Sequence, residues 1–137
     1  MLFGFSLNVN AETLPAAKDG KITLDKDYTI DGTAFDSTSE VNVLDLNGKT
    51  LTLNGILKLN KEFEIKNGTV IRNTSNTYGS LIEVNAGDKV VNLKDLVIDG
   101  NKIVMTLNVS SGAGFGIFVK TDANAFLDNV IVHIKHW

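Results

Sequence analysis

Four stretches of the chain share one alternating pattern of apolar and polar residues. In each, an apolar residue, a variable residue and a second apolar residue come before polar residues that are typical of turns. Alternation with a period of two is typical of a β-strand that buries one face and exposes the other. The four stretches are residues 44–48, 63–68, 91–96 and 125–130. The pattern therefore predicts short strands that each run into a sharp bend.

The polar residues at the bends are Asn47, Asn67, Asp95 and Asn129, at intervals of 20, 28 and 34 residues. Asn and Asp tolerate left-handed backbone dihedral angles, so they allow a sharp bend between two strands. The unequal intervals indicate a repeated structural unit whose loops differ in length. If the units stack, the side chains of these structural turns would hydrogen-bond to one another along the stack.

The repeated pattern predicts an all-β fold, a right-handed parallel β-helix (solenoid) of about four to five coils. Asn47-Gly48 alone could instead form a hairpin, but the bends at Asp95 and Asn129 lack the glycine that such a turn favours. The residues expected to face the interior are Leu44, Leu46, Leu51, Leu53, Phe63, Ile65, Val70, Ile82, Val84, Val91, Leu93, Leu96, Ile98, Val119, Leu127, Val130, Val132 and Ile134.

The composition agrees with this fold and excludes several classes of function. Val, Ile and Thr, which favour strands, account for 36 of the 137 residues, and 15 residues are Asn. The absence of Cys excludes disulfides, thiolate metal sites and a cysteine nucleophile. A formal net charge of −3 with a single Arg offers no basic surface for nucleic acid. No apolar run reaches the roughly 18 residues that a membrane-spanning helix needs.

The first eleven residues differ from the rest of the chain because they are largely apolar and precede the repeats. Val9-Asn10-Ala11 places small residues where a signal peptidase cleaves, so residues 1–11 are interpreted as the remnant of a secretory signal. The alternative is an N-terminal cap that packs Phe3, Phe5 and Leu7 on the core. Residues 12–137 are expected to form a single parallel β-helix domain that is truncated at its C-terminal end.

Several stretches resemble the pectate-lyase-like adhesive domains of bacterial cell-surface proteins. Residues 43–53 read Val-Leu-Asp-Leu-Asn-Gly-Lys-Thr-Leu-Thr-Leu, which is similar to a stretch near the start of those domains. Residues 65–70, 93–98 and 116–119 resemble the coils that follow, and residues 19–30 resemble the entry strand. The resemblance implies a pectin-lyase-like solenoid in a protein that is secreted or held at the bacterial cell surface.

Candidate catalytic residues are few. Asp99 and His133 occupy nearly equivalent positions in successive repeats, so they are candidates for an acid–base pair on adjacent coils. A surface pair without catalytic function is the simpler interpretation. Arg72, at the end of a strand, is expected to be a solvated loop charge. No cofactor is predicted. No metal site is predicted either, because His133 and His136 would point to opposite faces of a strand and could not bind one metal together.

A polar loop supplies the candidate ligand site. Sugars are usually held by an aromatic platform together with amide hydrogen bonds, and Tyr78 is the aromatic residue in the loop that also carries Asn73 and Asn76. These three residues are the candidate ligand-binding set for a polysaccharide or a host surface glycan. The alternative is that Tyr78 only covers the edge of a coil.

Three classes of function remain open at this stage. The first is a non-catalytic adhesion or spacer module, secreted or at the bacterial cell surface. The second is a polysaccharide lyase or hydrolase, or a fragment of a phage depolymerase, which would rest on analogy of fold. The third is a purely structural assembly fragment. No membrane or nucleic-acid partner is expected.

The last residues predict a self-association. Val132 and Ile134 would belong to a coil that no later residue completes, and an open β-helix end exposes backbone groups and apolar core. End-to-end association through the C-terminal coil is therefore expected, and Ile134→Lys should favour the monomer.

Overall fold

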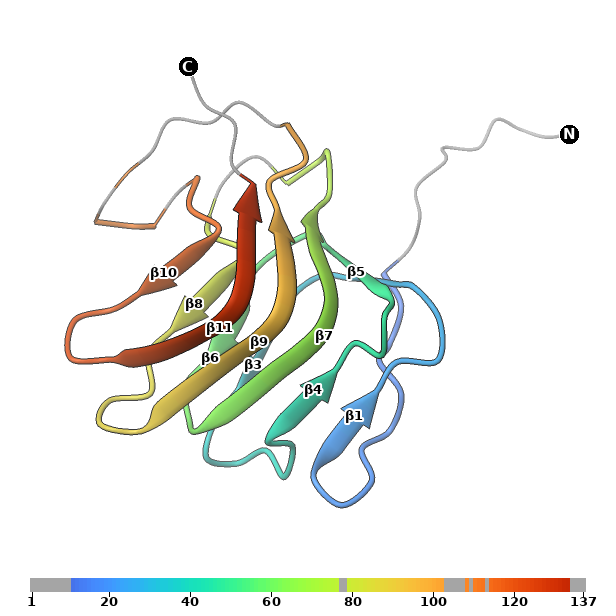
Figure 1. The fold of residues 1–137 in the computed structure, drawn as a ribbon, viewed down its shortest axis with the longest axis horizontal. Helices are drawn as coiled ribbons and strands as arrows, with labels where there is room; N and C mark the ends of the chain where they lie inside the picture. Colours follow the sequence, from blue (N-terminus) through green and yellow to red (C-terminus); the bar gives the residue numbers. More distant parts are fainter. Residues whose placement is uncertain (1–10, 77–78, 103–107, 109, 113, 134–137) are drawn as a thin grey trace, which may run out of the picture.

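The computed structural model describes residues 11–76, 79–102, 108, 110–112 and 114–133. All the regular secondary-structure elements in this part of the chain are β-strands (Figure 1). The strands are β1 (Lys21–Thr23), β2 (Tyr28–Ile30), β3 (Thr33–Phe35), β4 (Val43–Asp45), β5 (Thr50–Leu53), β6 (Leu57–Leu59), β7 (Phe63–Arg72), β8 (Ile82–Val84), β9 (Val90–Asp99), β10 (Ile117–Val119) and β11 (Asn124–His133).

These strands form two sheets in which all pairs are parallel. One sheet contains β1, β4, β7, β9 and β11, and β5 and β2 continue from the second half of β7. The other sheet has the order β10-β8-β6-β3. In Figure 1 the four-stranded sheet lies behind the long strands β7, β9 and β11. The prediction of an all-β protein with parallel strands is confirmed, and the pairing is compatible with a parallel β solenoid.

The hydrophobic core lies between the two sheets and is built from columns of aligned side chains. One column consists of register partners on β1, β4, β7, β9 and β11, namely Ile22, Leu44, Ile65, Leu93 and Leu127. All are buried except Leu127, which is 51% exposed. Leu44, Ile65 and Leu93 are therefore each covered by the strand before and the strand after them.

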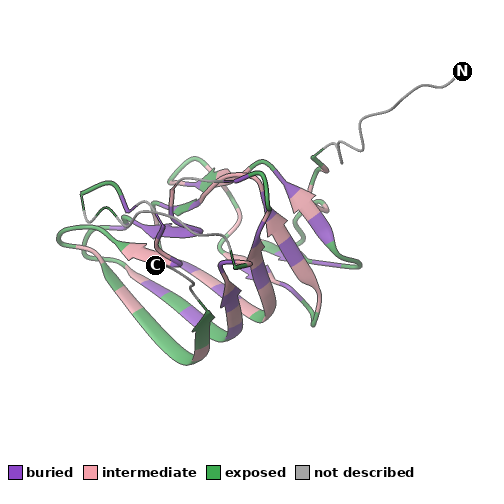
Figure 2. Ribbon diagram, turned by 90° about the horizontal axis from the view of Figure 1, so that it is seen from above, coloured by how far each residue is buried: buried purple, intermediate pink, exposed green. Residues whose placement is uncertain are grey.

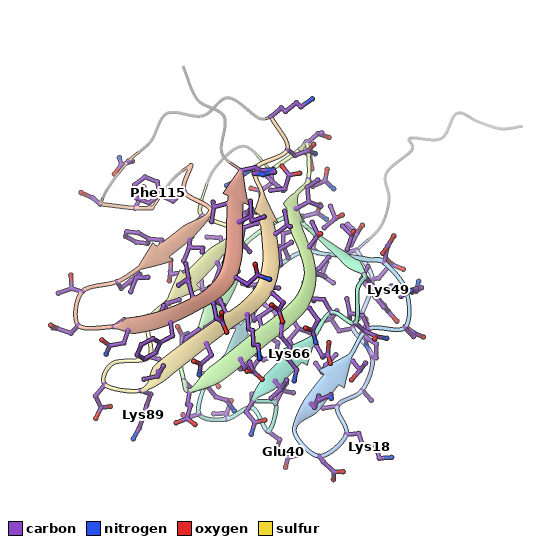
Figure 3. All side chains as sticks on the ribbon, viewed as in Figure 1. Lys18, Glu40, Lys49, Lys66, Lys89 and Phe115 are labelled. Carbon is purple, nitrogen blue, oxygen red and sulfur yellow. The ribbon has the colours of Figure 1, made fainter. Side chains whose placement is uncertain are left out.

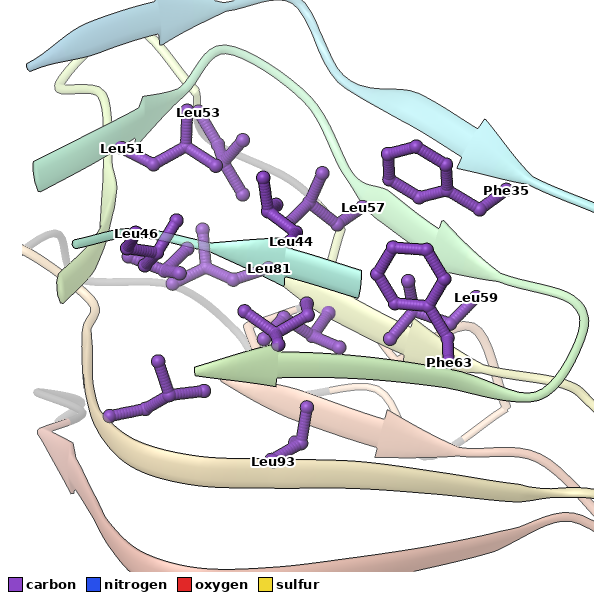
Figure 4. Close-up of a cluster of buried hydrophobic side chains, with 14 of the residues drawn as sticks. Phe35, Leu44, Leu46, Leu51, Leu53, Leu57, Leu59, Phe63, Leu81 and Leu93 are labelled. Carbon is purple, nitrogen blue, oxygen red and sulfur yellow. The ribbon is translucent and has the colours of Figure 1, made fainter. Parts of the chain in front are cut away.

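An aromatic pair within this interior joins the two sheets. The rings of Phe35 and Phe63 are stacked with their centroids 4.5 Å apart and an interplanar angle of 21° (Figure 4). Phe35 ends β3 and Phe63 begins β7, so this contact joins the two sheets. Stacked aromatic pairs stabilise a core by about 0.5–1.5 kcal/mol beyond the area that they bury.

The sequence pattern predicts most of the core. The predicted inward residues from Leu44 to Ile98 are all buried, which confirms their assignment. Val119, Leu127 and Val132 are the register partners of the buried Val84, Leu93 and Ile98, so they lie on the inward side as predicted, but their side chains are exposed. They lie on β10 and β11, and no further strand covers these two strands in the described part of the chain. Ile134 lies outside the described residues.

The opposite end of the stack is covered by the segment that precedes β1. The backbone N–H of Glu12 donates to Thr29 O at 2.7 Å, and its carboxylate accepts hydrogen bonds from Thr29 N at 2.9 Å and from Lys26 Nζ. The hydrogen bond from Lys26 lowers the pKa of the Glu12 carboxyl. Leu14, half-buried, packs against the core. This segment therefore protects the first coil. Residues 1–10 of the predicted signal remnant or cap lie outside the described residues.

Candidate functional site

The four structural turn residues occupy one geometric position in successive repeats. Asn47, Asn67, Asp95 and Asn129 all have positive φ, between 52° and 66°. Asn67, Asp95 and Asn129 lie inside β7, β9 and β11, where the register skips one residue and the strand turns a corner. A left-handed residue at the same place in each strand lets the next strand follow the same corner.

The turn side chains bond along the stack. Asn67 Nδ2 donates to Asp45 Oδ1 at 3.2 Å, and Asn129 Nδ2 donates to Asp95 Oδ1 at 2.9 Å. Asn47 Nδ2 instead donates to the backbone oxygen of Leu24 at 3.1 Å. The amide donors are therefore used between neighbouring repeats, although their acceptors are carboxylates and a carbonyl rather than other amides.

A second ladder, which the sequence analysis missed, follows the ends of β2, β5 and β7. Asn54 Nδ2 donates to Asp31 Oδ1 at 3.1 Å, and Asn73 Nδ2 donates to Asn54 Oδ1 at 2.6 Å. Asn101 Nδ2 continues the row by donating to Arg72 O at 3.0 Å. The signal in the sequence is the repeated Asx-Gly pair at residues 31–32 and 54–55, which directly follows an apolar residue in both places.

Two of the three candidate ligand residues, Asn73 and Asn76, form hydrogen bonds within the fold. Asn73 belongs to the second ladder, and its Oδ1 also accepts from Ser75 N at 3.2 Å. Asn76 is only 3% exposed, and its Nδ2 donates to the backbone oxygens of Leu53 and Gly55 at 3.3 and 3.2 Å. Asn76 therefore uses its amide donors within the fold, and Asn73 uses its amide to join two repeats. Tyr78 lies outside the described residues.

The candidate catalytic pair is brought together in register. His133, on β11, is the direct partner of Asp99, on β9, so the two residues are neighbours on adjacent strands. Asp99 Oδ1 accepts a hydrogen bond from Asn101 N at 2.7 Å, which caps the turn that follows β9. Within the described residues the structure shows no ion pair between the carboxylate and the imidazole. Asp99 and His133 are therefore adjacent without forming an ion pair.

Arg72 is inside the protein, and the prediction of a solvated loop charge is wrong. It is 1% exposed and is the register partner of Leu53, which in turn pairs with Ile30. The alternation that buries Val70 continues to the end of β7, so the side chain of Arg72, two residues later, also points inward. Burial lowers the pKa of the Arg72 guanidinium.

The buried guanidinium has incomplete hydrogen bonding. Arg72 Nη2 donates to Phe115 O at 3.4 Å, and the backbone N–H of Leu81 donates to the same oxygen at 3.1 Å. Phe115 lies in the loop before β10 (Figure 3). Within the described chain, Arg72 Nη1 and Ser80 Oγ are buried without a partner. Two polar groups that can donate a hydrogen bond are thus available inside the fold at this end of β7.

A hollow of about 470 Å³ opens at the N-terminal end of the core. Ile22, Ile30 and Phe35 form its apolar part, and Glu12 and Asp31 contribute carboxylates. Both carboxylates already accept hydrogen bonds, Glu12 from Thr29 N and Lys26 and Asp31 from Asn54. The lining of the hollow is therefore mixed, and its acidic groups are engaged in the fold.

The described ranges of the chain contain no group of three or more His, Asp or Glu side chains placed to hold a metal ion. They also contain no helix that is long and apolar enough to cross a membrane.

Comparison of the chain with protein-family models, with curated proteins and with solved structures finds no match in any of the three. Function is therefore inferred from the geometry of this chain.

Proposed function

We propose that the chain is a right-handed parallel β-helix of the pectate-lyase-like kind, acting as a non-catalytic spacer or adhesion module of a secreted or surface-attached bacterial protein. The supporting observation is that the turn amides are bonded between repeats. The donors of Asn54, Asn67, Asn73 and Asn129 each join one repeat to the one before it. Side chains used in this way stabilise a stack instead of converging on a substrate.

A stack of this kind suits a spacer for physical reasons. Each repeat contacts only its neighbours, so length is added without changing the cross-section. The ladders of hydrogen bonds and the columns of buried Leu and Ile resist bending at every level of the stack. If the module also adheres, the expected ligand is a polysaccharide or a host surface glycan, and the outer sheet face presents side chains of adjacent strands at a spacing of about 4.8 Å.

A second candidate function rests on one specific observation, the register pairing of Asp99 with His133. A polysaccharide lyase needs a base that removes the proton beside a uronate carboxylate. His133 is exposed and could take that role, with Asp99 orienting the imidazole. The carboxylate of Asp99, however, is engaged by Asn101 N.

Incubation of the full chain with polygalacturonate and calcium separates the two functions. We expect no unsaturated, ultraviolet-absorbing product, and in parallel we expect any binding on a glycan array to leave the glycan intact. A calcium-dependent product that is lost in His133→Ala and Asp99→Asn would overturn the proposal. Lys58→Ala, an exposed change on the other sheet, is the matched control.

A further inference from the structure

The exposed large apolar side chains of the described chain lie on two strands at one end of the stack. They are Val119, Phe126, Leu127, Ile131 and Val132. Val119 ends β10 and the other four lie on β11. Figure 2 shows this end of the stack coloured mainly as exposed. Large apolar side chains that are exposed together at one end of a fold indicate an interaction surface.

β11 is also an edge strand. It pairs with β9 and with no other described strand, so the backbone groups on its outer side are available for a further strand. Leu127 and Val132 are the last members of columns whose earlier members, Leu93 and Ile98, are fully buried. The surface therefore offers both backbone hydrogen bonds and unburied core side chains.

We propose that two copies of this chain associate through β11, which pairs antiparallel with β11 of the second copy across a two-fold axis. This self-association goes beyond the proposed spacer function. The strand is self-complementary when the axis passes between Asp128 and Asn129. Leu127 then lies opposite Val130 of the second copy, and both face the interior. Two open cores become one continuous core.

The same register also gives favourable cross-strand pairs on the outer face and avoids placing two like charges opposite each other. Phe126 and Ile131, which are 64% and 52% exposed, lie opposite each other on the outside of the sheet. An aromatic residue opposite a β-branched residue is a favourable cross-strand pair. Asp128 lies opposite Asn129, so its carboxylate meets an amide and not a second carboxylate. An isologous contact of this kind closes as a dimer.

A head-to-tail arrangement is disfavoured by the other end of the stack. The outer edge of β2 is occupied because Glu12 N donates to Thr29 O. On the outer edge of β1, Lys21 is held by an antiparallel bridge to Lys18. Ile22 and Ile30 at that end are buried. Among the described residues, the β11 end combines a long free edge with exposed large apolar side chains, so the same surface of a second copy is the favoured partner.

Disulfide trapping tests the register directly, because the chain has no native Cys. Phe126→Cys and Ile131→Cys full-length chains are oxidised separately and as an equimolar mixture. Opposed residues of an antiparallel pair have Cα atoms about 4.5–5.5 Å apart, within disulfide range. Identical positions lie five residues apart along the strand, roughly 16 Å. We expect a disulfide-linked dimer in the mixture and none in either variant alone. Equal cross-linking in a single variant, or none in the mixture, would overturn the proposal.

Sedimentation velocity is the second test of the proposed interface. The unmodified chain is expected to sediment as a concentration-dependent dimer, and Leu127→Lys as a monomer with an unchanged circular dichroism spectrum. Thr52→Lys, an outward change on β5 away from this end, is expected to leave the dimer intact. A monomeric wild-type chain at high micromolar concentration, or a dimer that survives Leu127→Lys, would contradict the interface.

Discussion

Replacing Leu93 by Ala is expected to lower the free energy of unfolding by about 2–5 kcal/mol. Leu93 is fully buried and lies in register between Ile65 on one side and Leu127 on the other. Truncation removes apolar contacts with both neighbours and leaves a cavity that hydrogen-bonded strands on either side cannot close. Urea unfolding followed by circular dichroism measures the loss.

Leu127→Ala is the matched control, because it makes the same chemical change one repeat further along the same column. Leu127 is half-exposed, so its truncation leaves no enclosed cavity and is expected to cost about 1 kcal/mol or less. Both variants are compared at a concentration where the chain is monomeric. Equal losses at the two positions would mean that the column is not buried as the structure shows.

Gly55→Ala is expected to destabilise the fold by about 3 kcal/mol. A Cβ at Gly55 would lie 2.0 Å from Asp31 O and 3.2 Å from Asp31 C in the repeat before it. Because this neighbour is backbone, relief requires the two repeats to separate. The same movement would strain the hydrogen bond from Asn54 to Asp31. Thermal unfolding measures the effect.

Gly87→Ala separates this close contact from backbone strain. A Cβ at Gly87 would meet no atom within 4 Å, but the residue has a φ of +60°. Its replacement is expected to cost about 1 kcal/mol, the strain of a left-handed alanine. If Gly55→Ala costs no more than Gly87→Ala, the two repeats do not approach as closely as described.

The interior of the sheets could be predicted from the sequence because alternation sets which side chains turn inward. Ile65 and Val70 were recognised in this way, and the bend between them required Asn67 to interrupt the alternation. The exposure of Leu127 could not be predicted in the same way. Burial depends on what covers a strand, and periodicity describes only the strand itself.

The polar residues were harder to predict, because a polar side chain gives no sign of which partner it finds. Asn76 was expected at the surface but donates to two backbone oxygens in the interior. Arg72 was expected in solvent because of its charge, although its parity with Val70 already indicated an inward position. The pairing of Asp99 with His133 followed from their equivalent positions in the repeat.

The most direct test of the central claim, parallel stacking of the repeats, uses two engineered cysteine pairs between β7 and β9. Glu64 is the register partner of Asn92, and Thr69 is the register partner of Val97. Adjacent strands lie about 4.8 Å apart, within the range that a disulfide spans. The control is Glu64→Cys with Lys94→Cys, which is two residues out of register.

Parallel stacking predicts that both in-register pairs, Glu64→Cys with Asn92→Cys and Thr69→Cys with Val97→Cys, form intramolecular disulfides under mild oxidation, and that the control pair does not. Mass spectrometry of the proteolysed chain identifies the linked peptides. Formation of only one in-register disulfide would indicate antiparallel strands, and formation of neither would show that these repeats are not neighbours. Either result would contradict the stacked arrangement.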